Sequence, residues 1–448
     1  MKKTRALDMI NGSLLPKIIL FSIPLMMSSI LQLFFNAADI IVVGQYAGDT
    51  SLAAIGSTGS LVNLIINVFI GLSIGTNVVI AKYLGANNEN KIKSCLQTSM
   101  SISVVFGVIL TIIGLIVCKP LLQLMGSPDD VINLASLYLN IYFLGMPGLL
   151  VYNFGASILR AKGDTKNPLL FLTIAGVVNL VLNLISVIYF KMGVAGVAIA
   201  TIISQYLCAY FVVSYLMNEQ GALHLDITNF QIDKKILVEI SKIGIPAGLQ
   251  GTIFSLSNVV IQSSINSFGS SMMAGNAAAG NIEGFVYAGT NAFYQSCISF
   301  TAQNFGAKKK ERILKILIIC LSLTIFFGLL LGIGLGYFGE FFINIYNNDP
   351  QVISYGATRL RYIGYSYFLC GMMEVMVASL RGIGYSFMPM IVTLIGACGF
   401  RLLWIAIVFA NFRYIEVVYL SYPISWALTT LFHIGCFFFV YKKTIKKL

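Results

Sequence analysis

Residues 95–117 read CLQTSMSISVVFGVILTIIGLIV and contain no Asp, Glu, Lys, Arg or His. A helix of roughly 20 apolar residues crosses the hydrocarbon core of a bilayer. In lipid the backbone must satisfy its own hydrogen bonds, which favours a helix, whereas a barrel strand would alternate polar and apolar residues. This stretch therefore predicts a transmembrane helix.

Comparable runs recur along the 448-residue chain, which is 57% hydrophobic and 10% charged, with a mean hydropathy of +0.85. This composition excludes an ordinary soluble domain and predicts an all-α polytopic membrane protein in contact with the lipid bilayer. We expect twelve transmembrane helices, at residues 15–43, 57–80, 95–117, 131–154, 169–190, 194–216, 240–264, 272–300, 313–337, 355–380, 388–410 and 417–440.

The basic residues indicate an orientation. Of 29 Lys and Arg, 23 fall in segments on the side of the N-terminus and 5 in segments on the other side. Because positive charge is retained in the cytoplasm, we expect a plasma (inner) membrane protein with both termini cytoplasmic. The net charge of +12 lies in short clusters between apolar runs rather than on one face, so we expect no nucleic-acid partner. We also expect a monomer.

The second half of the chain repeats the first in a constant register. Leu159, Arg160, Gly163 and Pro168 recur as Leu380, Arg381, Gly384 and Pro389, and Ala81, Gly85 and Ala86 recur as Ala302, Gly306 and Ala307. We expect two six-helix lobes, at residues 1–217 and 240–448, with a cytoplasmic linker at 218–239. Six is even, so both halves begin on the same side and the repeat is parallel, with a pseudo-two-fold axis along the membrane normal.

Asp39 is an acid within the first expected helix, on the C-terminal side of Pro24. Ionisable groups inside spans are expensive and mark functional sites. Asn179 and Asn183 share one helix face and could lie near Asp39. Asn153 and Thr201 are expected at a similar depth in the membrane. One carboxylate among neutral oxygens suits H⁺ or Na⁺, whereas the alternative is a hydrogen-bonded packing cluster.

The second half carries Glu283, Glu374 and Arg401 within its expected spans. An Arg paired with a Glu would be the least costly arrangement, so a structural ion pair and a substrate-binding group remain alternatives. Enzyme chemistry finds little support. No Walker A sequence occurs, the two histidines have no metal-ligand spacing, and we expect neither catalysis nor a cofactor.

With Pro24, Asp39, the segment Gln303-Asn304-Phe305-Gly306-Ala307 and the paired Leu-Arg-x-x-Gly segments, the chain resembles multidrug and toxic compound extrusion (MATE) transporters over essentially its whole length. The resemblance implies a two-lobed antiporter that exports small organic, often cationic compounds in exchange for H⁺ or Na⁺ by alternating access. The runner-up is a flippase for a lipid-linked or lipid-like substrate, a function of related superfamily members.

The resemblance also carries residue roles. In similar members the cation site uses an acid matching Asp39, amides matching Asn153 and Asn179 and a hydroxyl matching Thr201, usually with an aspartate where this chain has Asn183. Other members carry an acid in the tenth helix, where Glu374 lies. We hypothesise that cation uptake at Asp39 changes the bend of the helix at Pro24, which acts as a hinge.

Overall fold

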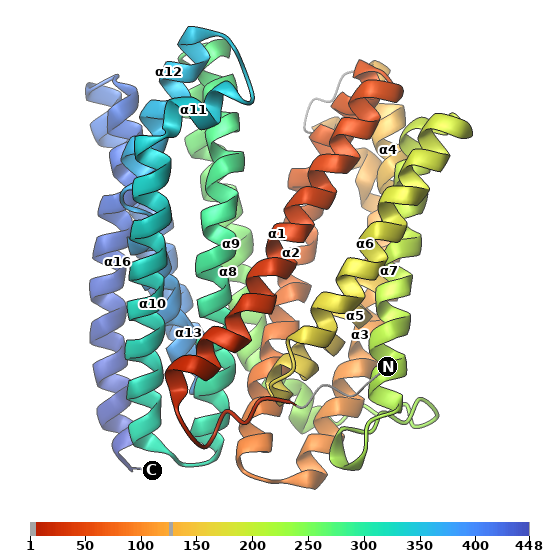
Figure 1. Cartoon of the computed structure of the whole chain (residues 1–448), viewed down its shortest axis with the longest axis vertical. Helices are drawn as coiled ribbons and strands as arrows, with labels where there is room; N and C mark the ends of the chain where they lie inside the picture. Colours follow the sequence, from red (N-terminus) through yellow and green to blue (C-terminus); the bar gives the residue numbers. More distant parts are fainter. Residues whose placement is uncertain (1–5, 125–128, 448) are drawn as a thin grey trace. The chain divides into compact units, whose positions relative to one another are not determined.

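The computed structural model describes residues 6–124 and 129–447, and the regular secondary structure within these residues is helical (Figure 1). The chain forms two compact units. The N-unit comprises Met27–Ile245 with the short segment Ala6-Leu7, and the C-unit comprises Asp8–Met26 and Pro246–Leu448.

Two helices of 33 residues each, α1 (Leu14–Tyr46) and α8 (Lys234–Asn266), pass from one unit to the other. Pro24 lies inside α1 and Pro246 inside α8, each close to the residue where the unit changes. A proline removes one helical hydrogen bond and is a common site of bending. The expected lobes divide the chain once, whereas the C-unit includes the start of α1 and the N-unit includes the start of α8. The expected lobe boundaries remain a prediction.

The other helices of the N-unit follow the order of the chain. They are α2 (Asp49–Gly85), α3 (Glu89–Leu124), α4 (Asp129–Leu144), α5 (Met146–Lys162), α6 (Lys166–Leu184) with the π-helical turn η1 (Ile185–Tyr189), α7 (Gly193–Met217) and the short η2 (Gly221–Leu223).

The C-unit repeats this arrangement with more interruptions. Its helices are α9 (Ser270–Gly306), α10 (Lys310–Tyr337), α11 (Gly339–Asn344), α12 (Pro350–Arg359), η3 (Leu360–Gly364), α13 (Tyr367–Gly382), α14 (Phe387–Thr393), η4 (Leu394–Gly399), α15 (Phe400–Trp404), η5 (Ile405–Phe409), α16 (Ile415–Lys443) and η6 (Ile445–Lys447).

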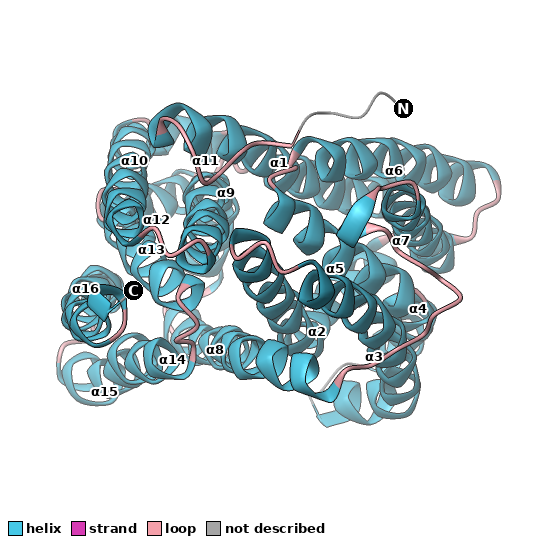
Figure 2. Ribbon diagram, turned by 90° about the horizontal axis from the view of Figure 1, so that it is seen from below, coloured by secondary structure: helices cyan, strands magenta, loops and turns pink. Residues whose placement is uncertain are grey.

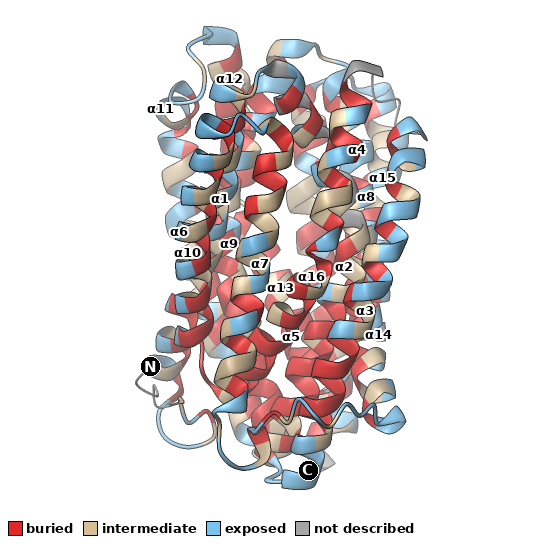
Figure 3. Ribbon diagram, turned by 90° about the vertical axis from the view of Figure 1, so that its right-hand side faces the viewer, coloured by how far each residue is buried: buried red, intermediate tan, exposed pale blue. Residues whose placement is uncertain are grey.

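Among the described residues, nine helices are long and apolar enough to span a membrane, or eleven if two bent pairs each count as one span. The remaining expected span, 272–300, lies in α9, which has 37 residues but carries Asn276, Asn281 and Glu283. Exposed apolar side chains such as Ile112 and Ile116 on α3 and Phe326 and Leu330 on α10 form faces suited to lipid, and Figure 3 shows exposed and buried residues along the same helices.

The expected spans at 131–154 and 355–380 each contain a bend that the sequence analysis did not anticipate. Val131–Leu144 and Met146–Lys162 meet at 48°, and Pro350–Gly364 and Tyr367–Gly382 meet at 45°. The first bend lies at Gly145, with a proline at position 147, and the second follows a π-helical turn. Apolar composition alone cannot reveal such bends, because both arms of a bent helix remain apolar.

The internal repeat extends to backbone conformation. Three pairs of residues that are equivalent in the register of the repeat both have a left-handed φ: Gly48 and Gly269, Asn87 and Lys308, and Gly163 and Gly384. The helices α2 and α9 also begin and end at residues equivalent in that register. The two halves therefore share their turns as well as their helices.

Equivalent helices pack in equivalent ways, as α3 contacts α5 and α10 contacts α13 (Figure 2). A Cβ placed on Gly107 of α3 would overlap Cα of Pro147, and one on Gly328 of α10 would lie 2.7 Å from Cα of Phe368. The repeat relates the first contact pair to the second. Close approach of helix backbones thus requires glycine at the same place in each unit.

Candidate functional site

The second part of α1 packs closely against α6 within the N-unit. Any side chain at Gly176 of α6 would collide with the Phe35 ring of α1. One turn beyond Phe35 on α1 lies Asp39, and beyond Gly176 on the same face of α6 lie Asn179 and Asn183. The contact between Phe35 and Gly176 therefore places the carboxylate beside both amides.

Asp39 is half-buried, whereas Asn179 and Asn183 are buried. The Asn183 amide nitrogen donates a hydrogen bond to Asp39 Oδ1. With its amide turned to satisfy its neighbours, Asn179 donates to the same Oδ1 at 3.1 Å and accepts from the backbone N–H of Thr201 at 3.3 Å. Two amides thus favour the ionised carboxylate.

Within the described part of the chain, no Lys, Arg or His forms an ion pair with Asp39. Asn183 Oδ1 is buried and accepts no hydrogen bond from a protein group. A carboxylate beside an uncommitted carbonyl oxygen offers two of the hard oxygen ligands that a small cation prefers. The arrangement is suited to holding H⁺ or Na⁺.

The other expected members lie at the edge of this cluster. Thr201 contributes its backbone N–H, while its hydroxyl donates to Val197 O at 2.9 Å. The Asn153 amide donates to Leu149 O of its own helix at 2.8 Å. Pro24 lies in the part of α1 that belongs to the C-unit.

An apolar layer follows the cluster along α1. Val42 and Val43 of α1 pack with Val187 of η1 and Val197 of α7, all at most 5% exposed. The four valines have no polar side-chain atoms and offer the Asp39 carboxylate no partner. Among the described residues, the side-chain hydrogen bonds to Asp39 come from α6.

In the C-unit, Glu283 pairs with Arg359 rather than with Arg401, so of the two alternatives left open for Glu283 a structural ion pair is formed, but with a different arginine. Arg359 Nε and Nη2 donate to the two carboxylate oxygens of Glu283 at 2.8 and 2.7 Å, and Arg359 Nη1 donates to Asn276. Arg359 lies near the start of the expected span 355–380 and was counted with the basic residues on the side opposite the N-terminus, yet it is 9% exposed. The pair links α9 to α12 and is bidentate, the geometry that best compensates two buried charges.

Arg401 contacts a hydroxyl and aromatic rings instead. Its Nε donates to Ser425 Oγ at 2.8 Å. The guanidinium carbon lies 4.3 Å from the ring centroid of Tyr422 and 5.4 Å from those of Trp426 and Phe254. These are cation–π distances.

Arg381 was expected in a cytoplasmic segment but is 3% exposed. It donates to Tyr294 Oη at 2.6 Å and to Gln250 Oε1 at 2.8 Å. The half-buried Glu374 interacts with Arg381 and with the Tyr287 hydroxyl. Glu374 thus belongs to a polar cluster of α8, α9 and α13.

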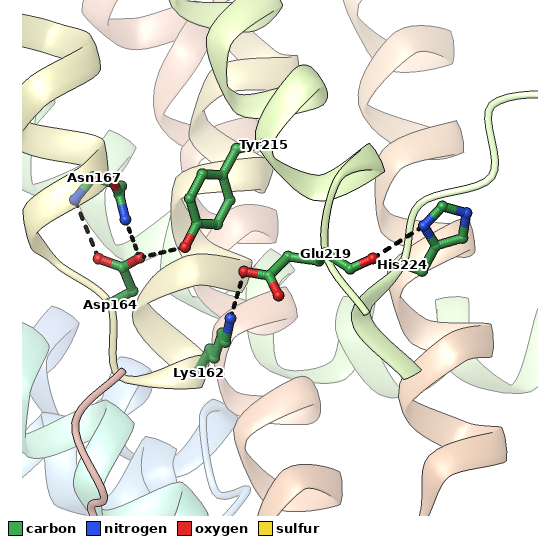
Figure 4. Close-up of polar contacts among 6 residues, drawn as sticks. All are labelled: Lys162, Asp164, Asn167, Tyr215, Glu219 and His224. Atoms are coloured by element: carbon green, nitrogen blue, oxygen red, sulfur yellow. Dashed lines mark hydrogen bonds and ion pairs between the residues drawn. The ribbon is translucent and has the colours of Figure 1, made fainter. Parts of the chain in front are cut away.

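Sequence reasoning missed a buried acid in the turn between α5 and α6 (Figure 4). Asp164 is 4% exposed, accepts from the Asn167 backbone N–H at 3.1 Å and accepts from the Tyr215 hydroxyl at 3.1 Å. Nearby, Lys162 and Glu219 form an ion pair at 2.6 Å. Asp164 lies between two expected spans, so its position in the sequence did not indicate burial. The repeated Leu-Arg-x-x-Gly segment directly before it was the feature that could have drawn attention to this turn. These contacts hold the turn against the end of α7.

Comparisons with known proteins match both halves of the chain. The MatE family model matches residues 24–185 and again 246–407. "Probable multidrug resistance protein YoeA" of Bacillus subtilis (strain 168) is 28% identical over 434 residues, which cover 95% of this chain and 93% of that protein. An "FAD transporter" of Shewanella oneidensis is 26% identical over 366 residues, 80% of each chain.

Among solved structures, a MATE protein crystallised in complex with MaL6 superimposes with a TM-score of 0.91 over 100% of both chains, at 22% sequence identity. At this identity the likeness shows the fold alone. The two matched segments of the family model together span more than half of the sequence, and the chain belongs to the MATE family of transporters.

Proposed function

We propose that this multi-pass membrane transporter exports small organic compounds, mainly cationic or amphiphilic, by alternating access in antiport with H⁺ or Na⁺. Membership of a multidrug efflux family supports export as the direction of transport. The name of one relative, "FAD transporter", indicates that matched proteins are not restricted to drugs, so an anionic aromatic compound belongs in any substrate panel.

The observation that carries the proposal is the environment of Asp39. It is a carboxylate in a membrane-spanning helix that accepts from two amides and, among the described residues, has no basic partner. Such a charge is costly in the membrane unless a cation or proton compensates it. A ligand shifts a conformational equilibrium only by its unequal affinity for the two states, and α1, which carries both Asp39 and Pro24, runs from one unit into the other.

The test is transport in proteoliposomes with imposed pH or Na⁺ gradients across a panel of organic cations and one anionic aromatic compound. We expect the wild-type protein to export substrate with one gradient and Asp39→Asn to lose gradient-driven export while retaining its folding. Asp226→Asn, in the connection between α7 and α8, is the matched control and should transport normally. Full efflux by Asp39→Asn would reject the coupling role.

The flippase alternative is tested in the same liposomes. Fluorescent lipid scrambling would favour a lipid-like substrate, and dye efflux without scrambling would favour export of soluble compounds. Arg401 is a buried cation with no acidic partner among the described residues. It is the reason to include anionic compounds among the substrates tested.

A further inference from the structure

Arg401 lies within the span Phe387–Phe409 and is 1% exposed. No carboxylate of the described residues lies within ion-pair distance of it, and Glu283 is already bound by Arg359. A buried charge is normally paired or bound to a compensating group. The C-unit therefore contains a cation whose counter-charge is not supplied by the described protein groups.

The donors around Arg401 outnumber the acceptors. Arg401 Nη2 is buried and donates to no protein acceptor, while Nε is satisfied by Ser425. Trp426 Nε1, in a ring that the guanidinium faces, is also buried and without an acceptor. A guanidinium edge and an indole N–H are both donors only, so the group that would satisfy them must accept.

The internal repeat relates this cluster to the candidate cation site of the N-unit. In the register of the internal repeat, Asn179 corresponds to Phe400, the neighbour of Arg401, and Thr201 corresponds to Tyr422. The helices α6 and α14 begin at residues 166 and 387, which are equivalent in the same register. Closely corresponding places thus carry an amide beside a carboxylate in one unit and a guanidinium in the other.

We propose that the Arg401 cluster, formed by Arg401, Phe254, Tyr422 and Trp426, binds a compact monoanion through Arg401 Nη2, with the Trp426 indole as a second donor. The shared chemistry is one negatively charged acceptor, supplied by chloride or by the carboxylate of an organic compound. Charge-assisted hydrogen bonds of this kind are short and strong. The site does not depend on cation coupling at Asp39.

The aromatic rings define the route to the site. Phe254 and Tyr422 are only partly buried, whereas Arg401 and Trp426 are enclosed. A ligand would therefore approach Arg401 from the side of these two rings, and a compact anion would displace them less than a bulky one.

Tryptophan fluorescence tests the proposal directly, because the chain has two tryptophans and Trp404→Phe leaves Trp426 as the single reporter. The purified protein is placed in detergent with the bulky sulfonate HEPES as the sole anion and titrated with chloride or with acetate. We expect a saturable change in Trp426 emission with at least one anion. A response to acetate alone assigns an organic carboxylate, and a response to chloride assigns the inorganic ion.

Arg401→Gln should abolish this response, and Arg413→Gln should retain it, because Arg413 is exposed and lies over the ring of Phe409. A flat titration with both anions, or an unchanged response in Arg401→Gln, would overturn the site.

Thermal melting of the chain with both tryptophans gives a second measurement if Trp404→Phe does not fold. The anion should raise the melting temperature of wild type by several degrees and leave Arg401→Gln unchanged. Neither readout involves transport, so failure here would leave the exporter proposal standing.

Discussion

Among individual residues, the candidate coupling site depends on which amides touch the Asp39 carboxylate. Asn183 donates to it directly, whereas Asn153 donates to the backbone of its own helix. The sequence alone does not distinguish these two asparagines. Their positions in the fold determine that Asn183 contacts the Asp39 carboxylate and that Asn153 contacts its own backbone instead.

Asn183→Leu removes a hydrogen bond that favours the ionised Asp39 carboxylate, so we expect it to strengthen proton binding by roughly tenfold or more, since such a bond contributes about 1.5–3 kcal/mol. It also removes the buried carbonyl oxygen, so we expect it to weaken Na⁺ binding. The measurement is export rate against Na⁺ or H⁺ concentration in proteoliposomes.

Asn153→Ala is the control for this experiment, and its concentration dependence should shift much less. A larger effect of Asn153→Ala than of Asn183→Leu would contradict the assignment. Thermal melting of both variants should confirm that each is folded, because Asn183 is fully buried.

Among the helices, α8 begins with a capping residue that also joins it to α3. Asp233 Oδ1 accepts from the Lys235 backbone N–H at 2.8 Å, its Oδ2 accepts from Ser94, and its own N–H donates to Thr98. These bonds, above all that from Lys235, hold the pKa of the Asp233 carboxyl below its usual value. The stabilisation they give is present above the ordinary pKa and is lost as the pH falls through the lowered one.

Asp233→Ala should therefore lower stability by about 1 kcal/mol at neutral pH, the usual cost of losing a helix N-cap. Asp233→Asn retains a capping oxygen without the charge, so it should cost less and show weaker dependence on pH. Melting temperature in detergent from neutral to acidic pH measures both effects. Equal pH dependence of wild type and Asp233→Ala would exclude this role.

The close approach of α10 to α13 gives a second prediction about helices. Gly328→Ala should destabilise the protein by roughly 1–3 kcal/mol, because the new methyl group would overlap Cα of Phe368. Gly334→Ala, on the same helix with no atom within 4 Å of its Cβ, should be neutral or slightly stabilising because alanine favours helix. Thermal melting of the two variants distinguishes packing from helix propensity.

For the molecule as a whole, the basic residues predict that both termini are cytoplasmic. A green fluorescent protein fused to the C-terminus should be fluorescent, and alkaline phosphatase fused after Lys191 should be active, since that loop is expected outside. The reverse pattern would overturn the orientation. The prediction rests on the distribution of Lys and Arg between the connecting segments.

Local properties of the chain were enough to predict the helical membrane class and the twofold repeat, and to single out the acid in the first span as a candidate site. Apolar runs of spanning length are visible within each segment, and the constant register of the repeat needs only comparison of the chain with itself. The family-model matches and the left-handed residues at equivalent positions agree with that repeat.

The polar partners, in contrast, depended on the tertiary fold. Arg359 was not among the residues that the sequence singled out, but the fold brings it to Glu283 and leaves Arg401 among aromatic rings. The bends in the two broken spans and the burial of Asp164 were likewise absent from the local pattern. The physical reason is that pairing of buried charges depends on distances between helices, whereas hydropathy depends only on each helix's own residues.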